Sequence, residues 1–97
     1  MYMSKKSPVM TAQAADAARI LGQQIRLARH ANGIPASRLA ELTDVSPRVI
    51  TRIERGDPTV SLGNALNAAT HAGVALFDIT DPKTLARTRR QGEQALT

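Results

Sequence analysis

The sequence lacks cysteine and has only two aromatic residues, and both shortages exclude classes of protein. Without cysteine there can be no disulfide and no thiolate metal ligand, and two histidines alone do not make a zinc site. Recognition of single-stranded RNA by base stacking needs aromatic platforms, for which Tyr2 and Phe77 are too few. We therefore expect no metal and no cofactor, and a reducing cytoplasm suits such a chain.

Long apolar runs are also missing. No stretch approaches the roughly 18 consecutive apolar residues of a membrane-spanning helix. Lys5 and Lys6 near the N-terminus are followed by Pro8, Gln13 and Asp16 instead of the apolar segment of a signal peptide. We therefore expect neither a membrane partner nor export.

The length and charge of the chain favour a small binding protein. Its 97 residues amount to one domain. Thirteen basic against eight acidic side chains give a net charge of +5, which attracts polyanions. The acidic residues are scattered, and neither a glycine-rich phosphate loop nor a nucleophile motif is present. We therefore do not expect an enzyme.

Apolar spacing and helix-ending residues predict four helices in the middle of the chain. The first runs from about Thr11 to Asn32, with Leu21, Ile25 and Ala28 on one apolar stripe. A second, shorter helix begins at Pro35 and ends around Thr43-Asp44. Its residues expected to face inward are Leu39, Ala40 and Leu42.

The third and fourth helices have clear capping signals. Ser46 as N-cap and Pro47 at the first helical position begin the third helix, which runs to Arg55. The fourth helix follows Ser61, ends near Gly73 and is expected to bury three residues, Leu62, Leu66 and Ala69.

After the fourth helix the apolar pattern changes. The residues from Val74 to Ile79 are rich in β-branched and aromatic side chains, which is typical of a strand, although a short fifth helix is the alternative. A lone strand has unpaired backbone groups, so its natural partner is the same strand of a second copy. We expect a homodimer with contacts through Val74, Leu76, Phe77 and Ile79.

The second and third helices match a helix-turn-helix unit of about twenty residues that starts at Ala36. The small Ala40 stands where the two helices cross, and Asp44 stands in the turn, where the backbone needs a positive φ. The residues placed to seal the core beneath the turn are Val45, Ile50 and Ile53.

The third helix separates its residues by angle. At about 100° per residue, its three arginines lie on one side and its isoleucines on the other. A basic ridge suits the major groove, where arginine binds guanine O6 and N7, although a solvated charged face is the alternative. We expect bases to be read by Pro47, Arg48, Thr51 and Arg52, and phosphates to be bound by Ser37, Arg38, Ser46 and Arg55.

The run IRLARHANGIPASRLAELTDVSPRVITRIERGDP resembles the Cro/phage-repressor (Xre) family of helix-turn-helix domains over about residues 17–73, most specifically in VSPRVITRIERG. The resemblance implies a mainly α, lambda-repressor-like domain of four to five helices and an ion pair between Arg29 and Glu54. Family members often have Thr and Gln where this chain has Pro35 and Ala36. We therefore expect weaker phosphate anchoring there.

The longer run RIERGDPTVSLGNALNAATHAGVALFDITDP resembles more narrowly the HipB-type antitoxins. In these, a strand that pairs across the dimer follows the repressor-like domain. The resemblance implies a bacterial, cytoplasmic, nucleoid-associated regulator that represses its own operon at a pseudo-palindromic site and binds a HipA-like kinase toxin. A stand-alone repressor and a protein-interaction module are the alternatives.

These features divide the chain into three parts. Residues 1–10 have no periodicity, which predicts a disordered leader, and residues 11–80 are expected to form the DNA-binding and dimerisation domain. Residues 81–97 are expected to be a flexible basic tail. Asp81-Pro82 could begin a helix there, but the residues that follow are polar all round.

Overall fold

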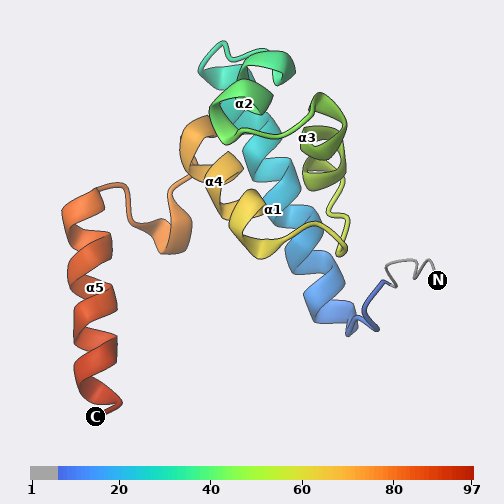
Figure 1. The fold of residues 1–97 in the computed structure, drawn as a ribbon. Coiled ribbons are helices and arrows are strands. Elements are labelled where there is room, and N and C mark those ends of the chain that lie inside the picture. Colours follow the sequence, from blue (N-terminus) through green and yellow to red (C-terminus); the bar gives the residue numbers. More distant parts are fainter. Residues whose placement is uncertain (1–6) are drawn as a thin grey trace.

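The computed structural model describes residues 7–97, in which all the regular secondary structure is helical. Helices α1 to α4 pack into one bundle, and α5 lies to one side of it (Figure 1). No helix in residues 7–97 is long and apolar enough to cross a membrane. The elements are α1 (Ala12–Ala31), α2 (Ala36–Thr43), α3 (Pro47–Glu54), α4 (Leu62–Ala72), the 3-10 turn η1 (Leu76–Asp78) and α5 (Pro82–Ala95).

The four predicted helices are confirmed, because their starts and ends are encoded locally. The side chains of Thr11, Ser46 and Ser61 each accept a hydrogen bond from a backbone N–H three residues on, which satisfies a donor that the helix leaves free. Pro35 precedes α2 without such a bond. Asp44 ends α2 with a φ of 59°, the left-handed conformation that the turn requires.

The core lies between α1, α2, α3 and α4 and is built from aliphatic side chains. Two of the three residues of α2 expected to face inward, Leu39 and Ala40, are buried. The expectation for Leu42 is wrong, since it is 36% exposed and Thr43 is buried instead. The expectation that Leu62 is buried is also wrong, since it stands at the first turn of α4 and is 73% exposed. The buried apolar residues are Ile25, Leu39, Ala40, Ile50, Ile53, Ala68, Ala69 and Ala72.

A close helix crossing positions α3 against α1. Gly22, in the middle of α1, is buried beneath the C-terminal end of α3. A Cβ atom at Gly22 would lie 2.5 Å from the Glu54 carbonyl oxygen and 2.6 Å from that of Ile53, closer than real Cβ contacts. The absence of a side chain at this position therefore allows the two helices to meet.

The predicted strand from Val74 to Ile79 is wrong, and residues 7–97 contain no strand. Phe77 and Asp78 have φ values of 57° and 58°, which are incompatible with an extended ladder. Val74 and Leu76 instead pack against the core of the same chain. The segment thus buries its apolar residues by turning back on the bundle, and strand pairing across a dimer has no structural basis.

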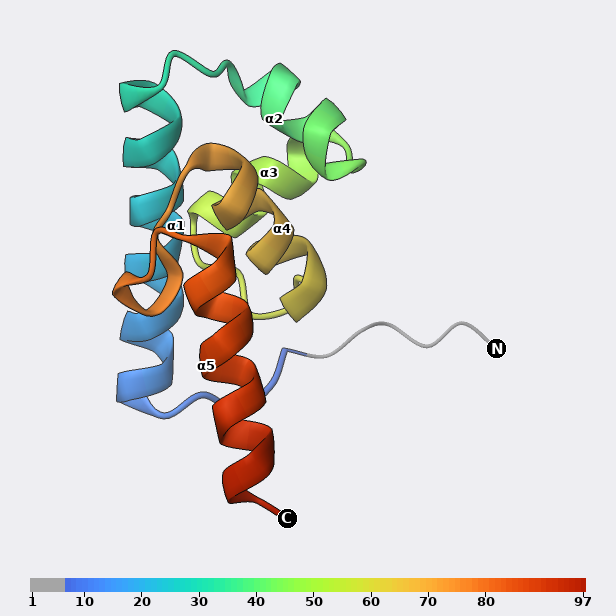
Figure 2. The ribbon, with the colours of Figure 1, turned by 90° about the vertical axis from the view of Figure 1, so that its left-hand side faces the viewer.

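The last part of the chain is more regular than expected, because residues 82–95 form α5 where the sequence favoured a flexible tail. Asp81 caps this helix by accepting hydrogen bonds from the Thr84 backbone N–H at 3.1 Å and hydroxyl at 2.8 Å. α5 makes few contacts with the bundle and lies on the side opposite α3 (Figures 1 and 2). At the other end, residues 7–10 form no helix, and the rest of the predicted leader lies outside the described residues.

Candidate nucleic-acid interface

The α2–turn–α3 unit has the geometry that its spacing predicts. Ala40 is 2% exposed at the contact of α2 with the core, and its carbonyl oxygen accepts a 3.0 Å hydrogen bond from the Val45 N–H across the turn. Asp44 between them supplies the left-handed residue. The turn is therefore fixed by backbone bonds, and α3 leaves it at a defined angle.

Helix α3 has one buried side and one exposed side. Ile50 and Ile53 are 0% and 4% exposed and anchor the helix in the core. The opposite side, which we call the recognition face, consists of four exposed residues. Its two arginines have no ion-pair partner within residues 7–97, so their charge is available to a polyanion. The recognition face comprises Pro47, Arg48, Thr51 and Arg55.

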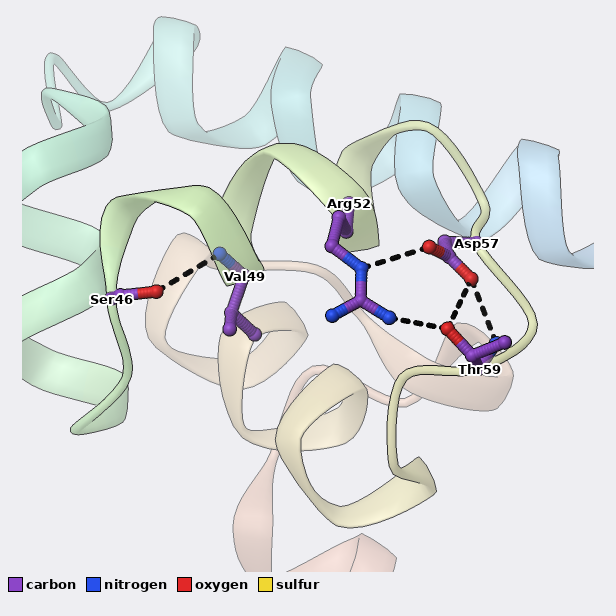
Figure 3. A network of polar contacts seen from close by, with 5 residues as sticks. All are labelled: Ser46, Val49, Arg52, Asp57 and Thr59. Carbon is purple, nitrogen blue, oxygen red and sulfur yellow. Dashed lines mark hydrogen bonds and ion pairs between the residues drawn. The ribbon is translucent and has the colours of Figure 1, made fainter. Parts of the chain in front are cut away.

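Arg52 lies at the edge of the recognition face and is held by the loop that follows α3 (Figure 3). Its Nε donates a 2.8 Å hydrogen bond to Asp57 Oδ2, and its Nη2 donates to Thr59 Oγ1. The Thr59 hydroxyl and the Arg52 guanidinium hold the pKa of Asp57 well below its ordinary value. The sequence analysis missed both partners, although the Asp-x-Thr spacing is typical of a local side-chain turn. Base reading by Arg52 stays a prediction.

At the other edge of α3, Glu54 is bound to Arg29 of α1. Arg29 Nε lies 2.8 Å from Glu54 Oε2 and Nη2 lies 3.2 Å from Oε1, while Nη1 donates to the Ile34 carbonyl oxygen at 3.1 Å. The two side chains are only 12% and 10% exposed. The bond to Glu54 raises the pKa of Arg29. The structure thus contains the ion pair that the resemblance implies, and it keeps the carboxylate turned toward α1.

The sequence matches a known protein family. A family model described as a helix-turn-helix domain matches residues 20–76, more than half of the sequence. The chain belongs to the helix-turn-helix domain family. This domain is typical of sequence-specific DNA-binding regulators. Searches among curated proteins and among solved structures gave no significant match.

The matched helix-turn-helix region also contains a basic residue that the sequence analysis missed. Arg26 on α1 is exposed to solvent. It lines a hollow together with Thr51 and Arg55 of the recognition face and Ala36 at the start of α2. Arg26 therefore adds positive charge beside α3. No helical spacing within α1 could indicate this proximity.

The predicted phosphate ligands near α2 and the turn are exposed. Ser37 has a free surface position, whereas Arg38 lies 3.1 Å from Glu41 in a solvent-exposed ion pair. Such pairs are weak, so the guanidinium can exchange Glu41 for a phosphate at little cost. Ser46 Oγ accepts the Val49 N–H at 3.3 Å, which leaves its hydroxyl proton to donate. Phosphate binding by these residues stays a prediction.

The four residues predicted to form the dimer contact do not lie on one common surface. Val74, Leu76 and Ile79 are half-buried within their own chain, whereas Phe77 is 82% exposed. Phe77 lines an apolar hollow with Pro82, Leu85 and Ala86 at the start of α5.

Proposed function

We propose that this helix-turn-helix protein is a transcriptional regulator that binds a pseudo-palindromic DNA site as a dimer. The main support for DNA binding is the recognition face of α3. There Arg48 and Arg55 are exposed on the side opposite the buried Ile50 and Ile53. The major groove is about 12 Å wide and admits one helix held in this way. The basic residues around it supply the phosphate contacts that orient a protein on the duplex.

In this proposal residues on the exposed side of α3, from its first turn onward, read bases, and the polar and basic residues around them bind phosphates. Arg48 extends from the first turn of α3, which in helix-turn-helix complexes lies nearest the base edges. Arg55 stands at the end of α3 and shares a surface hollow with Arg26, and we expect both to contact the sugar-phosphate backbone that flanks the groove. The proposed base-reading residues are Pro47, Arg48, Thr51 and Arg52, and the proposed phosphate ligands are Arg26, Ser37, Arg38, Ser46 and Arg55.

The test is selection of a binding site from random DNA duplexes, followed by affinity measurements on variants of that site. Arg48→Ala should lower affinity by about 1–3 kcal/mol and relax the preference at one base pair per half-site. Arg90→Ala removes the same charge from α5, far from α3, and should leave the preference unchanged. Equal weakening on all sequences would make Arg48 a phosphate ligand instead.

A salt titration separates DNA binding from a protein-interaction module. Specific binding should weaken steeply with salt, because each neutralised phosphate adds about 0.9 to the slope of log K against log salt concentration. If no duplex is selected and the residual binding is independent of salt, the proposal fails.

Phe77 and α5 support a dimer formed without a strand. An isolated helix as short as α5 is only marginally stable in water unless it packs on a surface. However, α5 makes few contacts with its own bundle. A second copy, seated against Phe77 and the apolar hollow beside it, would supply that surface. Two copies of α3 would then enter successive major grooves, about 34 Å apart.

Sedimentation measures this dimer. Phe77→Asp should give monomers and lower operator affinity. Leu62→Asp, at an apolar position of similar exposure outside the hollow beside Phe77, should leave the dimer intact. Dimers of Phe77→Asp that persist at low protein concentration would place the interface elsewhere.

A narrower candidate function is that of an antitoxin that represses its own operon and binds a HipA-like kinase toxin. It is supported by the sequence resemblance alone, since the strand that formed part of the likeness is not present in residues 7–97. Co-purification with the product of an adjacent kinase-like gene tests it, and the absence of such a partner favours a stand-alone repressor. In either case we propose action in the bacterial cytoplasm, on the nucleoid, without catalysis.

A further inference from the structure

We propose that Asp57 and Thr59 are positioning residues that orient Arg52 toward a guanine in the major groove, and so determine the base preferred at one position of each half-site. The inference rests on the proposed function. It concerns residues outside α3 that touch no base themselves.

The network around Arg52 is closed on one side and open on the other (Figure 3). Asp57 Oδ2 accepts from Arg52 Nε, and Asp57 Oδ1 accepts both the Thr59 hydroxyl at 2.6 Å and the Thr59 backbone N–H at 2.8 Å. The Thr59 oxygen in turn accepts from Arg52 Nη2. Each member therefore fixes the next, and the guanidinium plane cannot rotate without breaking two bonds.

The guanidinium group of Arg52 still has N–H donors that the network does not use. Of the five N–H donors of a guanidinium, this network uses one on Nε and one on Nη2. Nη1 has no hydrogen-bond partner in the described part of the chain, and the side chain is 39% exposed. The remaining Nη1 and Nη2 donors form the parallel pair that matches O6 and N7 of guanine.

Orientation distinguishes Arg52 from the other arginines of α3. Arg48 and Arg55 have no ion-pair partner within residues 7–97 and must lose rotamer freedom when they bind. Arg52 has lost that freedom before DNA arrives, which favours a contact that depends on direction.

The charge of Asp57 favours a base over a phosphate as the target of Arg52. Its lowered pKa keeps the carboxylate ionised at neutral pH. A carboxylate 2.8 Å from the arginine offsets the attraction to a phosphate, whereas it leaves the donor geometry toward a neutral base unchanged. The pair thus contributes little to binding of arbitrary DNA and more to the choice of sequence.

The experiment measures base preference at every position of the selected site. Asp57→Asn should lower the preference for guanine at one position per half-site by roughly fivefold to tenfold, while affinity for unrelated duplex stays the same or rises because a negative charge is lost. Asp16→Asn removes the same charge from an exposed position of α1 and should keep the preference.

Thr59 provides a matched pair that does not alter charge. Thr59→Val removes the hydroxyl and should lower the same preference, whereas Thr59→Ser retains it and should keep the preference. In an Arg52→Ala background, Asp57→Asn should have no further effect at that position. A purely structural role would lower Tm in these variants without changing the position-specific ratio.

The outcomes separate the two proposals. If Asp57→Asn and Thr59→Val keep the wild-type preference at every position, or weaken all duplexes alike, Arg52 contacts a phosphate or nothing, and the inference is wrong while the proposed function stands. If the wild-type protein prefers no sequence, both are wrong.

Discussion

The Arg29–Glu54 ion pair should be a main source of stability for the DNA-binding unit, because it joins the last turn of α1 to the end of α3. The perturbation is Arg29→Met, which keeps most of the aliphatic stem and removes the cation. Glu54 would then have a carboxylate that is 10% exposed and has lost both of its 2.8 Å and 3.2 Å bonds.

The magnitude follows from the burial of the pair. Exposed ion pairs contribute about 1 kcal/mol or less, whereas removal of one partner from a buried pair costs about 3–5 kcal/mol. With 12% and 10% of the two side chains exposed, this pair stands near the buried limit. We expect Arg29→Met to lower the free energy of unfolding by about 2–4 kcal/mol, part of it from the lost bond to the Ile34 carbonyl oxygen.

Urea denaturation followed by circular dichroism measures this loss. With a slope of about 2 kcal/mol per molar urea, the midpoint should fall by about 1–2 M. Glu54→Gln should lower the free energy of unfolding by less, because the amide oxygen of glutamine can still accept a hydrogen bond from Arg29. The double variant, Arg29→Met with Glu54→Gln, should be more stable than Arg29→Met alone. A coupling free energy below about 0.5 kcal/mol would refute the reasoning, since it would place the pair among ordinary solvated ones.

Three further predictions concern stability. Thr43→Val should raise the free energy of unfolding by about 1 kcal/mol in urea, because the buried Thr43 hydroxyl has no hydrogen-bond partner within residues 7–97; a loss instead would mean that the hydroxyl is satisfied in solution. Gly22→Ala should lower it by about 1–3 kcal/mol, since the new Cβ would meet backbone oxygens of α3, whereas Gly63→Ala, with no atom within 4 Å, should raise it by up to about 1 kcal/mol; equal effects would contradict the close crossing. The lowered pKa of Asp57, caused by the Thr59 hydroxyl and then Arg52, means that its ionised form stabilises the fold above the unfolded-state pKa of about 3.9, and that this contribution is lost as the pH falls toward the lower folded pKa. Below about pH 5 the Tm of the wild type should therefore fall more steeply than that of Asp57→Asn, and parallel curves would contradict the shift.

Features that depend on neighbouring residues were predictable from the sequence. The N-cap at Ser46, the left-handed residue Asp44 and the buried positions Ile50 and Ile53 follow from hydrogen-bond needs and helical period within a few residues. The same local signals separated the exposed basic side of α3 from its buried side. The amino-acid sequence alone thus determined the helix-turn-helix unit and most of its candidate interface.

The tertiary structure decided which segments meet. The run from Val74 to Ile79 has a composition that suits a strand, but Val74 and Leu76 pack on the bundle and the segment forms a turn. The sequence of this segment alone does not show that packing on the bundle is favoured over strand pairing. Arg26 comes beside α3, and Gly22 beneath it, only because α1 crosses the end of that helix. These outcomes depend on contacts between residues far apart in the chain, whose free energies arise when the core assembles.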